Sequence, residues 1–195
     1  MVEITTFPHF EVRIWNGASS APVSDHPNRS LLRLESRRTE FDKIEQCLLP
    51  KWSYHDVFKD SKGKPYLRDG THVSISHSGD YAAVAISTIP VGIDIQVQSP
   101  LLFKVRSKFC HPMELSQLSP SPEDELYLKI WCAKEAIFKI NGQGGNFARD
   151  IFCSDLNKTS NFLTFHQQIE GNKLQDVGVH FLKKTNYFVA IAQTL

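Results

Sequence analysis

The stretch Trp131-Cys-Ala-Lys134-Glu135-Ala-Ile-Phe-Lys139 places three charged residues within an otherwise apolar helical pattern. Residues 126–140 are apolar nearly all the way round at helical spacing, and such a helix is normally buried between other elements. Charges among apolar neighbours are costly unless they are paired, so the stretch predicts both a core helix and a functional site. The alternative is a Glu135/Lys139 pair on a solvated helix face, which stabilises a helix by only about 0.2–0.5 kcal/mol.

The two ends of this helix are marked by residues that cap helices. Ser121 is a suitable N-cap, Pro122 takes the first helical position, and Asp124 stands where a capping box needs an acid. Asn141-Gly142 is typical of a C-cap. The sequence therefore predicts a helix over residues 122–141, with the charged residues in its last turns.

The composition is that of a soluble globular protein. The 195 residues are 41% hydrophobic and 22% charged, enough for one domain or two small lobes. A net charge of +1 argues against attraction of the whole surface to nucleic acid or membrane, although a local basic pocket remains compatible with it. The N-terminal residues lack the pattern of a signal peptide, and no apolar run approaches a membrane span, so we expect a cytoplasmic location.

The four cysteines are scattered along the chain without CxxC or Cys/His metal-ligand spacing. They stand at positions 47, 110, 132 and 153, two of them in apolar helical contexts. Cysteines of this kind are reduced core thiols in cytosolic proteins. We therefore predict neither disulfides nor a zinc site.

The pattern along the chain predicts an α+β fold. Alternating and helical periodicities indicate strands at 10–15, 73–78, 81–87 and 91–97, helices at 29–49, 112–118 and 122–141, and a terminal hairpin at 178–182 and 187–192. Asp80-Tyr-Ala-Ala-Val-Ala-Ile also resembles Asn186-Tyr-Phe-Val-Ala-Ile-Ala, which favours a duplication. We expect two similar lobes, 1–98 and 99–195, related by a pseudo-twofold axis. Each would have a long helix packed on a small, mostly antiparallel sheet.

Asp94 is the second candidate site residue. In the predicted strand at 91–97 the odd positions are apolar and β-branched, so Gly92, Asp94 and Gln96 project from the other face. Asp is disfavoured in strands, and it serves either as a structural residue at a strand edge or in a site. Together with the helix carboxylate of Glu135 it could hold one hard cation. Mg²⁺ is commonly bound by one or two carboxylates, phosphate oxygens and water.

Several cations and donors elsewhere would suit a ligand rich in phosphate. Lys64 lies in a turn, Ser76 and His77 lie near the end of a strand, and Arg37 and Arg38 interrupt an apolar helical stripe. Each also has a structural explanation. Lys64 would be a solvated turn lysine, His77 a strand histidine whose ring nitrogens are hydrogen-bonded, and the arginines would cover a helix face with their aliphatic stems. Lysines near the predicted metal would act as point charges for phosphate.

Four motifs in this order and spacing resemble the 4′-phosphopantetheinyl transferases, of the two-lobed type that activates surfactin synthetase. They are Gly63-Lys64-Pro65, Ser74-Ile75-Ser76-His77-Ser78, Gly92-Ile93-Asp94-Ile95 and Trp131-x-x-Lys134-Glu135-x-x-x-Lys139. The resemblance covers roughly residues 60–145. It implies a monomer that binds coenzyme A and Mg²⁺ between two lobes. Such an enzyme, of the holo-[acyl-carrier-protein] synthase kind, transfers the 4′-phosphopantetheine arm to a serine of an apo acyl or peptidyl carrier protein and releases 3′,5′-adenosine bisphosphate.

The resemblance also implies roles for individual residues. Asp94 and Glu135 match the metal ligands, and Glu135 with Lys139 would serve catalysis, Glu135 as the base for the carrier serine. The residues implied as pyrophosphate contacts are Ser76, His77, Lys134 and Lys139. Those implied at the adenosine 3′-phosphate are Lys64 and Arg37. Many family members carry a second acid where this chain has Gln96, so a third acidic ligand is absent.

Two other classes of function remain compatible with these residues. A different Mg²⁺-dependent phosphoryl-transfer enzyme could use an Asp/Glu/Lys cluster and would ignore carrier proteins. A catalytically silent coenzyme A-binding protein would bind the same ligand and modify nothing, and Gln96 favours this reading. The residues leave open which pathway, such as fatty acid biosynthesis, supplies the carrier protein.

Overall fold

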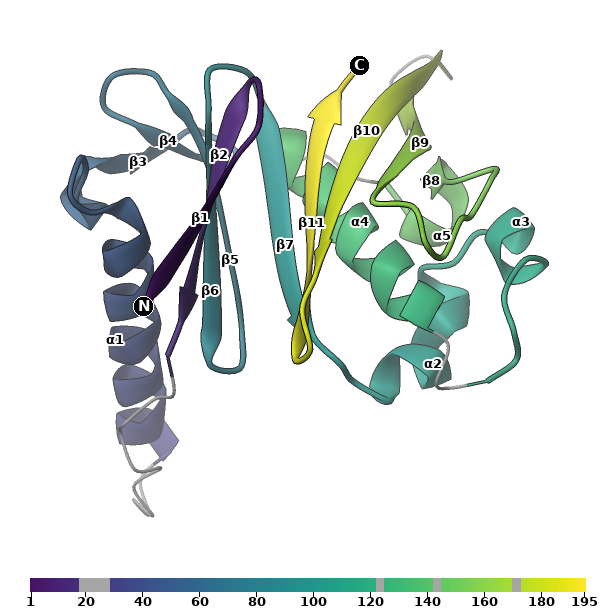
Figure 1. The fold of residues 1–195 in the computed structure, drawn as a ribbon, viewed down its shortest axis with the longest axis horizontal. Helices are drawn as coiled ribbons and strands as arrows, with labels where there is room; N and C mark the ends of the chain where they lie inside the picture. Colours follow the sequence, from purple (N-terminus) through teal and green to yellow (C-terminus); the bar gives the residue numbers. More distant parts are fainter. Residues whose placement is uncertain (18–28, 122–124, 142–144, 170–172) are drawn as a thin grey trace.

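Two antiparallel sheets with alternating apolar residues form the centre of the fold (Figure 1). The computed structural model describes residues 1–195 except 18–28, 122–124, 142–144 and 170–172, and the side chains of residues 29–37 and 141 are also outside the description. The six-stranded sheet contains, in spatial order, β1 (Val2–Thr6), β2 (Phe10–Asn16), β6 (Tyr81–Ser87), β5 (His72–Ser78), β4 (Pro65–Leu67) and β3 (Val57–Lys59). The five-stranded sheet contains β7 (Val91–Val97), β11 (Tyr187–Thr194), β10 (Lys173–Lys183), β9 (Phe162–Ile169) and β8 (Ile151–Phe152).

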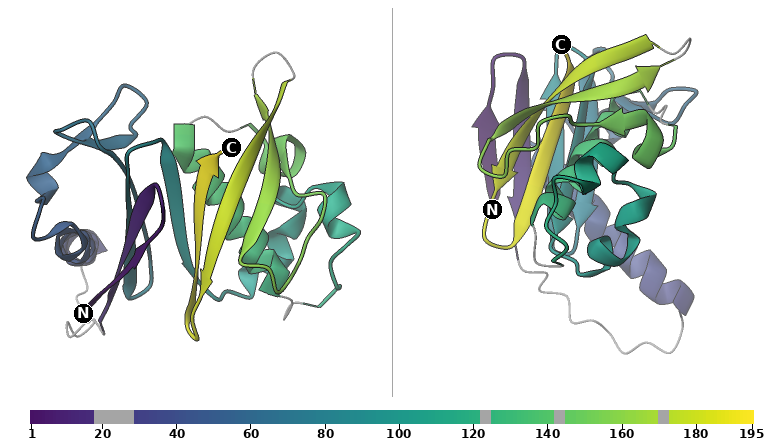
Figure 2. Two further views of the ribbon diagram at one scale, coloured as in Figure 1. Left: turned by 45° about the horizontal axis from the view of Figure 1, so that its top comes forward. Right: turned by 90° about the vertical axis from the view of Figure 1, so that its right-hand side faces the viewer.

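Two long helices cover the outer faces of the sheets (Figures 1 and 2). The helical elements are α1 (Arg29–Leu48), η1 (Tyr54–Asp56), α2 (Leu101–Val105), η2 (Arg106–Lys108), α3 (Pro112–Leu115), α4 (Glu125–Asn141) and α5 (Phe147–Asp150). Helix α1 packs on β2 and β6, and α4 packs on β7 and β11. The other faces of β2, β6, β7 and β11 meet each other in one apolar cluster. The order of layers is therefore helix, sheet, sheet, helix, in an α+β fold.

Strands β5 and β7 lie side by side where the two sheets meet, and serine hydroxyls join them. Ser74 Oγ accepts a hydrogen bond from the Ile93 amide at 3.0 Å, and Ser78 Oγ accepts one from the Val97 amide at 3.1 Å. Ser76, between these two serines, faces the same way because side chains alternate along a strand. The alternate serines therefore align β5 with β7 at the position of the candidate site.

Gly92 lets β7 approach α4 closely. A Cβ atom at this position would lie 1.9 Å from the carbonyl oxygen of Ala136 and 3.0 Å from the amide nitrogen of Ile140. Both obstacles are backbone atoms of the helix, so no change of side-chain rotamer could relieve them. The glycine thus fixes the spacing between the strand that carries Asp94 and the helix that carries Glu135.

Most of the predicted elements are confirmed, and one strand pairs in a different sheet from the other strands of its predicted lobe. The strands predicted at 10–15, 73–78, 81–87 and 91–97 and both predicted long helices are present, although residues 122–124 and Gly142 of the predicted helix caps lie outside the description. The strand at 91–97, predicted within the N-terminal lobe, pairs with β11 in the second sheet. Its apolar odd positions suit either sheet, so the strand's own pattern could not choose its partner.

Two further findings concern the cysteines and the length of the helices. All four cysteines are buried and free, as predicted. Among the described residues, no helix is both long enough and apolar enough to cross a membrane.

Candidate functional site

Asp94 and Lys139 form an ion pair between β7 and α4. Asp94 Oδ1 accepts hydrogen bonds from Lys139 Nζ and from Ser76 Oγ, each at 2.8 Å, and the same Nζ lies 2.9 Å from that hydroxyl. The Asp94 residue is only 6% exposed, whereas the Lys139 side chain is 27% exposed. Lys139 therefore pairs with the strand carboxylate, and the alternative of a Glu135/Lys139 pair on a solvated face is wrong.

The second oxygen of Asp94 is a buried acceptor. Asp94 Oδ2 has no hydrogen-bond partner among the described residues. Leaving a carboxylate oxygen unpaired in the interior is costly, and such an atom needs an explanation such as an absent ion. The oxygen is suited to binding a cation.

Glu135 faces the same cluster from α4. Burial raises the pKa of this carboxyl, the nearby charge of Asp94 raises it further, and Lys139 lowers it. Two carboxylates this close repel each other, and a divalent cation between them would remove the repulsion. We call Ser76, Asp94, Glu135 and Lys139 the carboxylate cluster.

The donor set of the carboxylate cluster fits a magnesium ion with an incomplete protein shell. Oxygen ligands from one or two carboxylates, with phosphate and water completing the coordination, are the usual arrangement for Mg²⁺. Within the described ranges, no group of three or more His, Cys, Asp and Glu side chains is placed to hold a metal ion. The two carboxylates suit a metal whose remaining ligands are phosphate oxygens and water.

Lys134 is buried away from the cluster, with a different set of partners. Its ammonium is fully buried and donates to Glu114 Oε2 at 2.6 Å, to the Phe109 carbonyl at 2.7 Å and to the Phe147 carbonyl at 3.0 Å. These three contacts use all three N–H donors of the ammonium. The predicted pyrophosphate contact by Lys134 has no geometric support.

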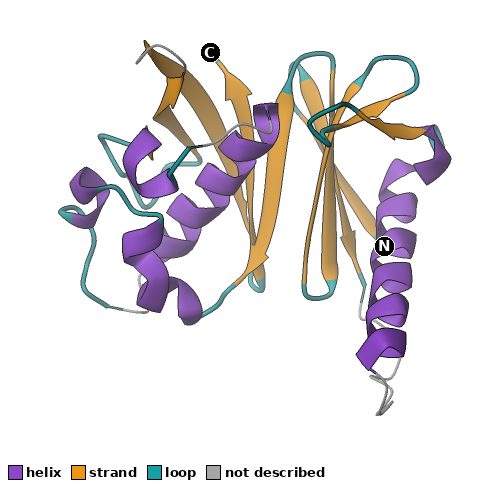
Figure 3. Ribbon diagram, turned by 180° about the vertical axis from the view of Figure 1, so that it is seen from behind, coloured by secondary structure: helices purple, strands orange, loops and turns teal. Residues whose placement is uncertain are grey.

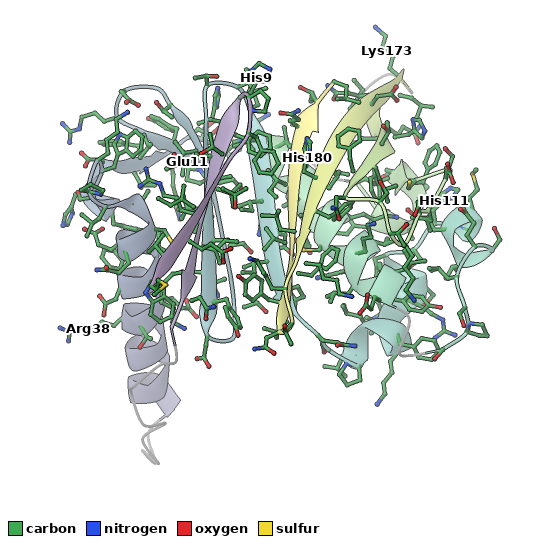
Figure 4. The ribbon with its side chains drawn as sticks, viewed as in Figure 1. His9, Glu11, Arg38, His111, Lys173 and His180 are labelled. Carbon is green, nitrogen blue, oxygen red and sulfur yellow. The ribbon has the colours of Figure 1, made fainter. Side chains whose placement is uncertain are left out.

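His77 lies on the opposite face of β5 from Ser76. Its Nε2 is 3.6 Å from Glu40 Oε2 of α1, and its side chain is 48% exposed. Arg37, three residues before Glu40 on α1, has a side chain outside the described residues. Arg38 is exposed and points away from the sheets (Figure 4). The structure thus brings Ser76 to the carboxylate cluster, and it places His77 beside α1.

Lys64 connects the first sheet's edge to the end of α4. Its Nζ donates to the carbonyl of Ile140, in the last turn of the helix, and lies 3.4 Å from the carbonyl of Val91. A cation here complements the negative end of the helix dipole. Partial burial lowers the pKa of Lys64.

An open cavity of about 510 Å³ surrounds Lys64. It is lined by residues of the 60–66 turn, by Gly70 and His72, and by Pro90 and Ile140. Desolvation, followed by the charge of Lys64, lowers the pKa of His72. The cavity therefore combines cationic or donor groups with apolar walls, and it opens beside the end of the helix that carries the carboxylate cluster.

Glu114 was not among the residues singled out from the sequence. It is fully buried, and its Oε1 accepts from the Cys153 amide at 3.0 Å while its Oε2 accepts from the His111 amide at 2.7 Å. The sequence His111-Pro112-Met-Glu114 does carry the signature of a helix start, with a proline at the first position and an acid at the third. That signature predicts the cap but gives no sign of the buried lysine.

Comparison with known proteins assigns the chain to a family. Residues 90–192, about half of the chain, match the family model described as the 4′-phosphopantetheinyl transferase superfamily. The matched segment contains β7 and α4, and with them Asp94, Glu135 and Lys139. The chain belongs to this superfamily.

Curated relatives agree with the family model. The chain is 33% identical over 104 residues to 4′-phosphopantetheinyl transferase gsp of Aneurinibacillus migulanus, which covers 52% of this chain and 44% of the relative. It is 32% identical over 101 residues to 4′-phosphopantetheinyl transferase Sfp of Bacillus subtilis, covering 49% and 45%. A putative 4′-phosphopantetheinyl transferase of Synechocystis is 29% identical over 152 residues, covering 67% and 58%. The chain thus spans about half the length of the curated relatives it matches.

Proposed function

We propose that this protein transfers the 4′-phosphopantetheine arm of coenzyme A to a serine of an apo acyl or peptidyl carrier protein. The observation that carries the proposal is the placement of Asp94, Glu135 and Lys139 between β7 and α4, inside the segment that matches the superfamily. The reaction joins the serine oxygen to the β-phosphorus of coenzyme A, breaks the diphosphate bridge and releases 3′,5′-adenosine bisphosphate. The protein must orient the diphosphate and offset its charge.

Asp94 and Glu135 would hold a Mg²⁺ ion. The free oxygen of Asp94 and the raised pKa of Glu135 support this assignment, because both describe carboxylates that lack a sufficient cationic partner. A bound Mg²⁺ neutralises phosphate charge and fixes the orientation of the diphosphate. Gln96, half-buried two residues further along β7, is suited to hold a water molecule of the metal's shell without adding charge.

Lys139 and Ser76 would contact the diphosphate. Lys139 is the most exposed member of the Ser76–Asp94–Lys139 triangle, so its ammonium can leave the carboxylate for an incoming phosphate oxygen. Lysine binds phosphate as a mobile point charge, and such contacts strengthen in the transition state. Ser76 would then be free to donate to the ligand or to Asp94.

Glu135 would also accept the proton of the carrier serine, directly or through water. A general base works best when its pKa lies near the operating pH, and burial and Asp94 shift the pKa of Glu135 in that direction. The proton moves from the serine hydroxyl to the carboxylate as the serine oxygen attacks phosphorus. The leaving phosphate of the adenosine bisphosphate keeps the bridging oxygen and its electron pair.

Lys64 would bind the adenosine 3′-phosphate. It lies in a cavity that has room for a nucleotide end and opens beside the C-terminal end of α4. Binding requires the ammonium to exchange its helix carbonyl for phosphate, and a charged acceptor is the stronger partner. We also propose, from the family resemblance, that Arg37 contacts the adenosine 3′-phosphate and that His77 contacts the pyrophosphate.

The layered arrangement supports two related lobes with the ligand between them. Each long helix covers one sheet, which is compatible with a pseudo-twofold axis. The change of sheet between β6 and β7 favours a lobe boundary close to residues 88–90, rather than the predicted boundary at 98/99. We propose that the protein acts as a cytoplasmic monomer on a carrier protein of the acyl or peptidyl type, with neither nucleic acid nor membrane as partner.

One experiment tests the proposed function against its alternatives. An apo acyl carrier protein and an apo peptidyl carrier protein are incubated with this protein, coenzyme A and Mg²⁺, and their intact masses are measured. We expect a mass increase equal to one phosphopantetheine arm, and no increase when Asp94→Ala replaces the wild type. Binding of coenzyme A without any mass change on a broad carrier panel would identify a silent binding protein. Phosphate release from simple esters would identify another phosphoryl-transfer enzyme.

A further inference from the structure

The buried ion pair between Lys134 and Glu114 joins five segments behind the carboxylate cluster. Lys134 belongs to α4 and Glu114 to α3, and neither side chain is exposed to solvent. Their other partners come from the end of η2, from α5 and from the residue after β8. Figure 3 shows these short helices gathered beside α4, and Figure 4 places His111, at the start of α3, on the outer edge of this group.

The pair has no access to a ligand as it stands. All three donors of Lys134 are used, and both oxygens of Glu114 accept hydrogen bonds. Desolvation is costly for both charges, and replacing such a pair with apolar residues is often neutral or stabilising. Stability alone therefore explains poorly why a charged pair stands in this position.

Lys134 precedes Glu135 directly, and this adjacency couples the pair to the cluster. Successive helix positions are about 100° apart around the axis, so one residue anchors the helix while the next faces the carboxylate cluster. On another side of α4, Gly92 of β7 touches the backbone of Ala136. The helix is thus held from two directions at the turn that carries Glu135.

The magnitude of this coupling follows from the size of a helix. With side chains the radius is about 5–6 Å, so a rotation of about 10° moves a carboxylate at the surface by about 1 Å. A displacement of about 1 Å costs roughly a hundredfold in rate. A contact that fixes the rotation of α4 next to Glu135 therefore affects function, even though it lies outside the carboxylate cluster.

We propose that Lys134 and Glu114 are positioning residues that fix the rotation of α4 and so set the place of the Glu135 carboxylate opposite Asp94. This inference rests on the proposed function, in which Glu135 is a metal ligand. It replaces the direct pyrophosphate contact predicted for Lys134 with an indirect role, and it gives Glu114 a role as well.

The test uses Lys134→Met, Glu114→Gln and the double variant, because the double variant leaves no uncompensated buried charge. Three quantities are measured on the folded protein: kcat for carrier modification, the Kd of Mn²⁺ by electron paramagnetic resonance in the presence of coenzyme A, and the Kd of coenzyme A with metal chelated. We expect kcat to fall by about a hundredfold and the Mn²⁺ Kd to rise about 10–100-fold. The coenzyme A Kd should stay within about threefold. The double variant should be no worse than either single variant, since each breaks the same link.

Lys129→Met is the matched control. Lys129 is also a buried lysine of α4, and it donates to the carbonyls of Asn157 at 2.8 Å and Ser160 at 2.6 Å. Its loss should lower stability and leave kcat and the Mn²⁺ Kd unchanged. The same result for the double variant at Lys134 and Glu114 would show that the pair is only structural and overturn the proposal.

Other outcomes would also test the positioning role of Lys134 and Glu114. A coenzyme A Kd raised about tenfold or more by Lys134→Met, but not by Glu114→Gln, would show that Lys134 touches the ligand directly. If the wild type neither binds Mn²⁺ nor modifies any carrier, the proposed function fails and the positioning role fails with it. Wild-type activity combined with unaffected variants overturns the positioning role alone.

Discussion

Replacing Gly92 with alanine should separate β7 from α4 and damage the site without touching its side chains. The added Cβ would lie 1.9 Å from the Ala136 carbonyl oxygen and 2.9 Å from its carbon. The first distance is about 1.5 Å short of ordinary van der Waals contact, so strand and helix must move apart by a comparable amount. Overpacking of this kind costs about 1–3 kcal/mol of the free energy of unfolding. A shift of about 1 Å between Asp94 and Glu135 should reduce kcat about a hundredfold.

Gly178→Ala supplies the matched comparison. A Cβ there would meet side-chain atoms of Leu195 and Phe162 at 2.9 Å, and both side chains are exposed, so they can move aside. We expect a change in unfolding free energy within about 1 kcal/mol and unaltered kcat. Urea unfolding gives the stability of both variants, and intact-mass kinetics on a carrier protein gives their rates. If Gly92→Ala matches Gly178→Ala in both measurements, the close approach of β7 and α4 does not control the site.

Three further predictions concern the residues of the proposed site. Asp94→Asn should abolish carrier modification while the protein stays folded by circular dichroism, and retained turnover would remove Asp94 from the metal site. Lys64→Met should raise the KM for coenzyme A about tenfold or more and leave that for 3′-dephospho-coenzyme A nearly unchanged, with equal effects on both ruling out the 3′-phosphate contact. Because the folded-state pKa of Glu135 is raised, the metal-free protein loses stability as pH rises from the unfolded-state value through the folded one. Glu135→Gln should therefore be more stable than wild type at pH 7 without metal and lose that advantage near pH 4, as thermal unfolding would show.

The sequence predicted the long helices and the central strands because each carries a complete periodicity of its own. The sequence of α4 is apolar nearly all the way round, β5 and β7 alternate over seven residues each, and β6 is a nearly continuous apolar run. Short elements such as β4 and β8, with three and two residues, carry no such periodicity. Their conformation depends on the strands beside them. The placement of β7 in the second sheet depends on β11, which lies about ninety residues away in the chain.

The candidate site was predicted in part for the same reason. Asp94, Ser76 and Lys139 stand out as polar residues within apolar periodic segments, and the structure brings these three together. Lys134 stands out by the same criterion and yet faces a buried carboxylate. A charge in an apolar helix signals only that a partner exists. Whether the partner is Glu114 or a ligand depends on how the helix is rotated about its axis. That rotation is set by tertiary packing and not by the sequence of the helix alone.

The charged residues of the helix motif therefore have different roles, depending on the side of α4 on which they lie. Lys134 points into the protein and holds the helix, whereas Glu135 and Lys139 point toward Asp94. Strand β5 divides its residues in a comparable way: Ser74 and Ser78 bond the backbone of β7, and Ser76 between them bonds Asp94 itself. In α4 and in β5, residues with structural contacts stand next to the residue that faces the carboxylate cluster. Two like-charged carboxylates with one unpaired oxygen need such support, because the surrounding fold has to meet the cost of keeping them together.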